Sequence, residues 1–391
     1  MAKISIMGYG VVGSGLIELI DKNRENNKSE IQITSILVRN KEKHINCSHN
    51  EVITTDSEEF FSAESDIVVE VIGGIHPAYE YVKRALNMKK HVVTANKDLI
   101  ASYGEELFKI ANENNVALKF EASVAGGIPI IKPLIETLYG NNINSIRAIL
   151  NGTTNFILTK MISDNISYDE CLKEAQALGF AESNPESDVR GYDAARKLAI
   201  LSTLAFNKKI NWEQINIDGI TEIDELDIAY ASKYNCKIKL VAEAFNGKNN
   251  VFVSVKPMLV DENSMLAQID NEFNIVSLQG DEIGELSFIG KGAGKLPTGS
   301  AVYGDVNDIV NNRLVKVTAF EEEEVEVNKY SHKTCNSILR IKTTDKNEVE
   351  RKCREAFNNI KFIDKTLKDE VVAYIECTSE AYIQKLIETI S

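Results

Sequence analysis

Residues 3–20, "KISIMGYGVVGSGLIELI", decide the fold of the N-terminal part of the chain. They read as a short apolar strand, a glycine turn and the start of a helix, with three glycines spaced as G-x-G-x-x-G. In that context the glycines permit a tight turn, a close approach of the main chain to a pyrophosphate, and close packing of helix on strand. The free N–H groups at the helix start would face the phosphates. The predicted cofactor-binding residues here are Gly8, Gly10, Val11, Val12 and Gly13. A glycine turn without a ligand would show the same spacing.

The composition of the chain sets the class of protein. With 391 residues it is too long for one ordinary core, so two or three domains are expected. The formal net charge of −14 and the lack of a basic run argue against a nucleic acid partner. Six scattered cysteines form no C-x-x-C pair, which argues against a zinc or disulfide framework. We see no signal peptide and no apolar run of membrane-spanning length, so we expect a cytoplasmic protein without a membrane partner.

Strand and helix patterns alternate through about residue 130. This alternation predicts an α/β fold with a doubly wound parallel sheet, a Rossmann-type domain over residues 1–130. Ligands bind beyond the carboxyl ends of such strands. The expected tips are residues 8–13, 39, 73–74, 94–97 and 121–128. Arg39 stands where a carboxylate would favour NAD, and a cation there suits the 2′-phosphate of NADP. A solvated basic loop is the alternative for this arginine.

The pattern changes after the first domain. Residues 131–311 alternate apolar and polar positions, which predicts a mostly antiparallel sheet with one face covered by helices. A helix near residue 299 could return to the first domain. Residues 312–391 are expected to form a small α+β module. An acidic stretch at residues 321–324 resembles a linker or edge, and the tail from residue 336 reads as strand, helix, strand, strand, helix.

A helix with almost no polar face, "GYDAARKLAILSTLAF", spans residues 191–206. Asp193 and Lys197 lie four residues apart on one face of it. An ordinary i,i+4 ion pair on a helix shoulder explains this spacing. A catalytic pair in a cleft is the alternative, because buried lysine and aspartate are rare unless paired.

The motifs together resemble the homoserine dehydrogenase family. The matching stretches are "GYGVVGSG", "VVEVIGG", "TANKDLIA", "FEASVAGGIPII", "NGTTNFIL", "GFAESNPESDVRGYDAARKLAIL" and "KGAGKLPTGSAVYGD". The resemblance implies an NAD(P)H-dependent reduction of L-aspartate 4-semialdehyde to L-homoserine, in threonine, methionine and isoleucine biosynthesis. It also implies a homodimer or homotetramer.

Residue roles follow from the same resemblance. Lys197 matches the catalytic acid/base and Asp193 its partner. Glu182 and Asp188 match substrate-binding carboxylates, although Asp188 could instead cap the helix that follows it. Lys97 matches a lysine between cofactor and substrate. Further cofactor-binding residues implied here are Gly73, Thr94 and Gly294, with NADP(H) expected over NAD(H). A sodium ion is expected at oxygens of Glu121, Val124, Gly126 and Ile128, with an ion-free loop as the alternative.

The tail departs from the family pattern. It has nearly the strand order of an ACT regulatory module, but its first turn, "TTDKNEVE", lacks the glycine found where amino acids bind. We therefore expect weak control by threonine.

Two other functions fit the sequence less well. An aspartate-semialdehyde dehydrogenase needs a nucleophilic cysteine in a strand-to-helix turn, and no cysteine sits in one beside a histidine. A nucleotide sensor would not need Glu182, Asp193 and Lys197.

Overall fold

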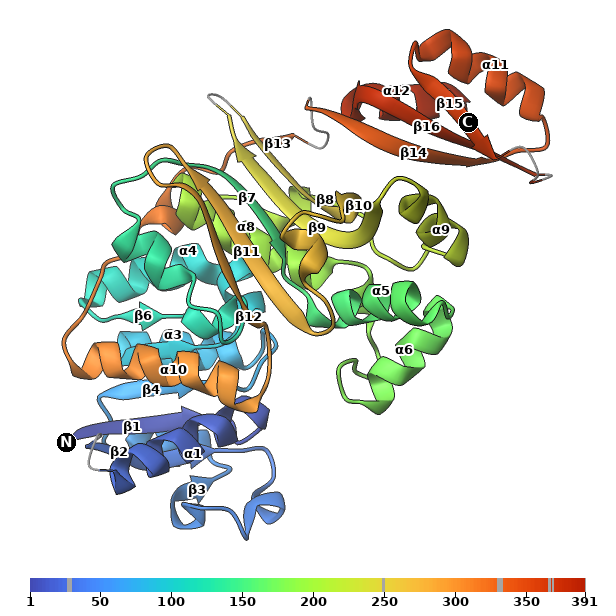
Figure 1. The fold of residues 1–391 in the computed structure, drawn as a ribbon. Helices are drawn as coiled ribbons and strands as arrows, with labels where there is room; N and C mark the ends of the chain where they lie inside the picture. The colour runs from blue at the N-terminus through green and yellow to red at the C-terminus, as the bar shows by residue number, and fades with distance from the viewer. Residues whose placement is uncertain (27–29, 248–249, 329–332, 365–366, 368, 391) are drawn as a thin grey trace.

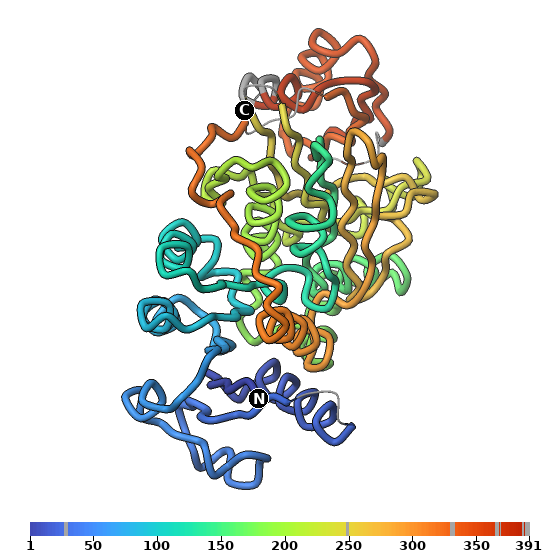
Figure 2. The backbone as a smooth tube through the Cα atoms, turned by 90° about the vertical axis from the view of Figure 1, so that its left-hand side faces the viewer, coloured from blue at the N-terminus to red at the C-terminus, as the bar shows by residue number. Residues whose placement is uncertain are grey.

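The computed structural model describes the chain except for residues 27–29, 248–249, 329–332, 365–366, 368 and 391. Helices pack on three sheets in the described part of the chain (Figure 1). Figure 2 shows the N-terminal and C-terminal parts at opposite ends of the molecule, with the second sheet between them. Within the described ranges, no helix has both the length and the apolar character needed to cross a membrane.

The first sheet is parallel, with the strand order β3-β2-β1-β4-β5-β6. Its strands are β1 (Ala2–Met7), β2 (Ile31–Leu37), β3 (Ile53–Thr54), β4 (Ile67–Glu70), β5 (His91–Thr94) and β6 (Leu118–Lys119). The helices between them are α1 (Val11–Glu25), α2 (Ser57–Ser62), α3 (Ala78–Asn87) and α4 (Lys97–Asn114). The predicted doubly wound sheet is confirmed. Its strand order changes direction between β1 and β4, the place where such sheets bind ligands.

Helix α10 (Lys295–Val310) returns from the second part of the chain and packs on α1 (Figure 1). It begins four residues before the predicted start, because Pro297 is tolerated in the first turn of a helix. Gly15 and Gly299 make the crossing close: a Cβ on Gly15 would lie 2.1 Å from the carbonyl oxygen of Lys295. The two helices therefore meet main chain to main chain.

The second sheet has the order β12-β11-β7-β9-β10-β13, and β8 pairs with β10 off this path. Its strands are β7 (Ile143–Ile149), β8 (Asn216–Ile217), β9 (Cys236–Asn246), β10 (Val251–Asp261), β11 (Phe273–Gly280), β12 (Gly284–Lys291) and β13 (Val327–Asn328). The helices of this part are α5 (Gly152–Asp164), α6 (Tyr168–Ala177), α7 (Glu186–Val189), α8 (Tyr192–Phe206) and α9 (Glu225–Lys233). The five longer strands are antiparallel, as predicted, and α8 packs on β7, β9 and β10.

The segment after α10 packs against the body of the protein before it reaches the tail. Phe320 is 6% exposed and stacks on Phe108 of α4 with ring centroids 4.9 Å apart. Glu324 lies 3.9 Å from the ammonium of Lys209. The acidic stretch that resembled a linker is therefore docked beside α4 and α8.

The C-terminal module has a three-stranded antiparallel sheet of order β14-β16-β15. Its elements are β14 (Thr334–Lys342), α11 (Lys346–Ala356), β15 (Ile360–Asp364), β16 (Glu370–Ser379) and α12 (Glu380–Ile390). This is the predicted order of strand, helix, strand, strand, helix. The residue limits predicted for the three domains stay predictions.

Candidate active site

Four segments bring polar and charged groups together where the first sheet meets the second. They are the start of α4, the turn from β7 into α5, helix α7 and the first turns of α8. Asn96 caps α4 by accepting a hydrogen bond from the N–H of Leu99, which places Lys97 at the first helical position. A cation is unfavourable at this positive end of a helix dipole, so Lys97 needs an acidic partner.

Asp193 supplies that partner, and it lies between two lysines. Its Oδ2 accepts a hydrogen bond of 2.6 Å from Lys197 Nζ, and its Oδ1 lies 3.2 Å from Lys97 Nζ. Lys197 Nζ also donates to the carbonyl oxygen of Leu150 at 2.9 Å. Among the described residues Lys197 has these two partners, which leaves one N–H of its ammonium for another acceptor.

Burial makes this charge arrangement consequential. The side chains of Asp193, Lys197 and Lys97 are 7%, 13% and 28% exposed. Burial acts to raise the pKa of Asp193, but the ammonium groups of Lys197 and Lys97 hold that pKa well below its usual range. Burial acts to lower the pKa of Lys97, and the charge of Asp193 instead keeps that pKa raised. Asp193 and Lys97 are therefore charged near neutral pH.

A second carboxylate, Asp188, approaches Asp193 from α7. Asn151 Nδ2 joins the two, donating to Asp188 Oδ1 at 2.7 Å and to Asp193 Oδ2 at 2.9 Å. Burial and the nearby charge of Asp193 raise the pKa of Asp188. The alternative that Asp188 caps the following helix is wrong, because Gly191 occupies the cap position of α8. Gly191 adopts a φ of 83°, which a side chain would strain.

Glu182 is not brought into this group. It lies exposed in the loop between α6 and α7, where its carbonyl oxygen accepts a hydrogen bond from the side chain of Gln176. In the described part of the chain no hydrogen bond or ion pair joins its carboxylate to the lysines. Its expected role in substrate binding stays a prediction.

An ion pair missed by the sequence reasoning lies next to Lys97. Arg196 of α8 places its Nε 2.6 Å from Asp98 Oδ1 of α4, and its guanidinium lies over the ring of Trp212. Two ion pairs thus join the starts of α4 and α8. Asp193 and Arg196 lie one helical turn apart on α8, and they pair with the adjacent residues Lys97 and Asp98 of α4. A single sequence cannot show that these two helices meet.

The glycine turn has the geometry that a dinucleotide needs. Gly8 has a φ of 110°, and a Cβ on Gly13 would lie 2.2 Å from the carbonyl oxygen of Gly8. A Cβ on Gly10 would meet no atom within 4 Å, so the main chain there is open to a ligand. Helix α1 has no side-chain cap, and Val11 at its start is 66% exposed. A pyrophosphate at this helix start would satisfy the free N–H groups.

The other expected cofactor positions are placed as follows. Arg39 is exposed just after β2, and Gly294 is the cap residue of α10. Gly73 has a φ of 70° in the turn after β4. Thr94 is fully buried, and its hydroxyl donates to the carboxylate of Glu70. The carboxylate of Glu70 also accepts hydrogen bonds from the N–H groups of Ile72 and Gly73, so it holds this turn in place.

Comparison with known proteins finds matches to one family over most of the chain. The homoserine dehydrogenase family model matches residues 129–307, and the model described as the NAD binding domain of homoserine dehydrogenase matches residues 8–121. The homoserine dehydrogenase of Bacillus subtilis strain 168 is 42% identical over 322 residues, which cover 81% of this chain and 74% of that protein.

The chain belongs to the homoserine dehydrogenase family.

Solved structures of the homoserine dehydrogenase family share the fold. A crystal structure of a homoserine dehydrogenase from Thiobacillus denitrificans has a TM-score of 0.90 at 34% identity and covers 100% of this chain and 94% of its own. A hyperthermophilic archaeal homoserine dehydrogenase in complex with NADPH has a TM-score of 0.68 at 31% identity. The match covers 80% of this chain and 98% of the archaeal chain. The resemblance seen in the sequence motifs is confirmed, and the chain is an oxidoreductase of this family with an NAD-binding domain.

The loop expected to bind sodium is mostly buried, and hydrogen bonds from the main chain hold its first residue. Glu121 does not present a free carboxylate: its two oxygens accept N–H groups of residues 130, 131 and 132 at 2.6–2.8 Å. The carbonyl oxygens of Val124, Gly126 and Ile128 accept no hydrogen bond in the described part of the chain. Three unpaired carbonyl oxygens suit a hard cation.

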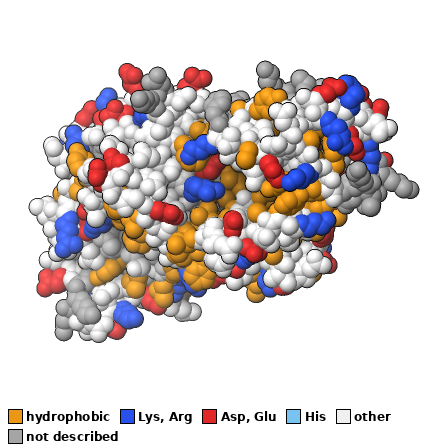
Figure 3. Space-filling model, turned by 45° about the horizontal axis from the view of Figure 1, so that its top comes forward, with side chains coloured by type: hydrophobic (Ala, Val, Ile, Leu, Met, Phe, Trp, Pro, Cys, Tyr) orange, Lys and Arg blue, Asp and Glu red, His pale blue; other side chains and the backbone are white. Residues whose placement is uncertain are grey.

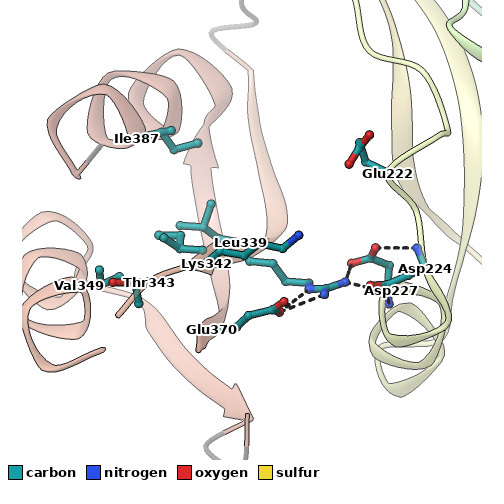
Figure 4. A pocket seen from close by; sticks show the side chains of 11 residues that line it. Glu222, Asp224, Asp227, Leu339, Lys342, Thr343, Val349, Glu370 and Ile387 are labelled. Carbon is teal, nitrogen blue, oxygen red and sulfur yellow. Dashed lines mark hydrogen bonds and ion pairs between the residues drawn. The ribbon is translucent and has the colours of Figure 1, made fainter. Parts of the chain in front are cut away.

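A separate cavity of about 680 Å³ lies between the C-terminal module and α9 of this homoserine dehydrogenase family member (Figure 4). Arg340 of β14 makes ion pairs there with Asp224, Asp227 and Glu370 at 2.7–3.0 Å. The ion pairs with Asp224 and Asp227 tie the module to α9, and the pair with Glu370 lies within the module. On the face seen in Figure 3, the coloured lysine and arginine side chains are interspersed with acidic and hydrophobic ones.

Proposed function

We propose that the chain catalyses the reduction of L-aspartate 4-semialdehyde to L-homoserine, with Lys197 as the acid/base and NADPH as the preferred cofactor. The single observation that carries the proposal is the carboxylate of Asp193 held between the ammonium groups of Lys197 and Lys97. The enzyme family and the open glycine turn support it.

A reduced nicotinamide, when bound, supplies the hydride that the aldehyde carbon accepts. The carbonyl oxygen then gains negative charge, and an ammonium aimed at it stabilises that charge and supplies a proton. Lys197 has one N–H without a partner among the described residues, so it can take this role. Asp193 orients Lys197 and offsets the cost of burying it.

The substrate is an amino acid, so its ammonium needs a carboxylate. Asp188 lies beside the pair and is the first candidate, with Glu182 reaching the substrate from its loop. Lys97 would lie between substrate and cofactor. Gly8, Gly10 and Gly13 would hold the pyrophosphate, and Arg39 the 2′-phosphate.

The remaining parts of the proposal concern the cation, the assembly and the pathway. A sodium ion would be held by the carbonyl oxygens of residues 124, 126 and 128 near Glu121. The chain would work as a homodimer or homotetramer in the cytoplasm. Its product would feed threonine, methionine and isoleucine synthesis.

Steady-state oxidation of homoserine with NADP⁺ and with NAD⁺ tests the proposal. Replacing Lys197 by alanine should lower kcat at least ~10²-fold, while the affinity for the cofactor stays nearly unchanged. Lys160→Ala is the matched control, because it removes the lysine of an exposed i,i+4 pair with Asp164. Near-normal turnover of Lys197→Ala would remove this lysine from the chemistry.

A further inference from the structure

Asn151 stands at the centre of the candidate site, and nothing in the sequence motifs assigns it a task. It is 4% exposed and immediately precedes α5. Its Oδ1 accepts the N–H of Thr154 at 2.8 Å, so it caps the helix. Its Nδ2 donates to Asp188 and Asp193.

The chemistry of these neighbours fixes the orientation of the amide. A charged carboxylate can only accept hydrogen bonds, and a main-chain N–H can only donate one. The nitrogen of Asn151 must therefore face the carboxylates, and its oxygen must face Thr154. Both amide hydrogens and the oxygen are in use, so the side chain has one orientation.

The segment 150–151 holds both members of the central ion pair. The carbonyl oxygen of Leu150 accepts from Lys197, and the amide of Asn151 donates to Asp193. The other groups that face Asp193 are Lys97 from α4 and Asp188 from α7. A neutral donor at Asn151 can stabilise both carboxylates without adding a charge that competes with either lysine.

We propose that Asn151 is a positioning residue for the reaction: its amide orients Asp193 against Lys197 and keeps Asp188 ionised beside Asp193 to meet the ammonium of the substrate. This inference rests on the proposed function. The amide performs the second role because a hydrogen bond to the charged form of Asp188 opposes the effects of burial and of the neighbouring carboxylate. The charge of Lys197 and the hydroxyl of Thr153, which donates to Asp188 Oδ2 at 3.3 Å, act in the same direction and remain in the Asn151 variants.

Asn151→Ser separates positioning from helix capping. Serine is as good a cap residue as asparagine, so α5 keeps an acceptor for the N–H of Thr154. The donor to Asp188 and Asp193 is lost. We expect kcat to fall about 10- to 100-fold, the scale of a lost hydrogen bond to charged groups. The acid limb of the kcat/KM profile should move to higher pH, because the pKa of Asp188 rises further. Asn151→Asp keeps the cap but adds a third carboxylate, so its kcat should fall further than that of Asn151→Ser.

Ser167→Ala is the control for capping, since it removes the cap of α6, a helix that supplies no residue of the candidate site. It should leave the pH profile of turnover unchanged. A pH profile and a kcat of Asn151→Ser equal to those of the wild type would overturn the inference while the proposed function stands.

A second measurement does not depend on activity. The pKa of Asp188 is higher in the folded protein than its ordinary value. The folded protein therefore loses stability as the pH rises through the folded pKa and Asp188 becomes ionised. Urea unfolding should therefore show that Asn151→Ser lowers the free energy of unfolding, relative to the wild type, by more at pH 8 than at pH 5. An equal loss at both pH values would overturn the inference. If the wild type fails to oxidise homoserine, the proposed function fails, and this measurement still decides whether Asn151 holds Asp188 ionised.

Discussion

Replacing Asp193 by asparagine removes one charge and almost no volume. Lys197, Lys97 and Asn151 all aim donors at this carboxylate, within 2.6–3.2 Å. An asparagine has one acceptor oxygen, so its NH₂ group must face at least one of these donors. The two lysines then lose the anion that lies between them.

The structure sets the size of the effect. Removing one partner of a buried ion pair costs about 3–5 kcal/mol, and the partial exposure of Lys97 places the expected loss near 3 kcal/mol. Turnover should fall at least ~10²-fold, because Lys197 loses its orientation and part of its electrostatic support.

The dependence of stability on pH has a definite sign. Burial acts to raise the pKa of Asp193, but Lys197 and Lys97 hold it below its ordinary value of 3.8. The carboxylate therefore contributes stability that is present above about pH 4 and lost as the pH falls below it. The difference in unfolding free energy between the wild type and Asp193→Asn should shrink in acid.

Urea unfolding from pH 3 to 7 and homoserine oxidation by both proteins measure these effects. Asp164→Asn is the matched control, because it alters the exposed i,i+4 pair with Lys160 and should leave both quantities near the wild type. The reasoning is refuted if Asp193→Asn turns over within threefold of the wild type, or if its stability loss does not change with pH.

Two further predictions follow from the same structure. Arg39→Ala should raise the KM for NADPH about tenfold while changing that for NADH little, because a charge-assisted hydrogen bond to the 2′-phosphate is lost; equal effects in steady-state assays would mean that Arg39 does not contact this phosphate. Phe320→Ala should lower the free energy of unfolding by about 3 kcal/mol, since the ring is buried against Phe108 and Gly104; an unchanged urea midpoint would show that the segment after α10 is not docked.

Local patterns were the most predictable part of this chain. The roles of Gly8, Gly10 and Gly13 follow from spacing within one strand-turn-helix unit. The structure shows the positive φ of Gly8, open space at Gly10 and close packing at Gly13, and the contact with a pyrophosphate stays a prediction. The pairing of Asp193 with Lys197 follows from the repeat of a single helix. Such features depend on neighbours in the chain, which the sequence orders directly.

Contacts between distant segments were less accessible. Asn151 begins the stretch "NGTTNFIL", but its hydrogen bonds to Asp188 and Asp193 depend on the position of α7 and α8 beside the end of β7. The prediction that an oxygen of Glu121 binds a cation stays a prediction, but the sequence did not show that its carboxylate accepts the N–H groups of residues 130–132. The loop conformation decides this, and both Ala125 and Gly126 have positive φ values there.

The sequence by itself determined the parallel sheet, the dinucleotide turn, the helix with its acid and lysine, and the strand order of the tail. These are set by glycine placement and by hydrophobic periodicity, which act over a few residues. The tertiary structure alone decided that Lys97 completes the group around Asp193, that Arg196 pairs with Asp98, and that Arg340 ties the tail to α9. The physical reason is that a buried charge is tolerated only where folding brings a partner to it, and no local pattern names the partner.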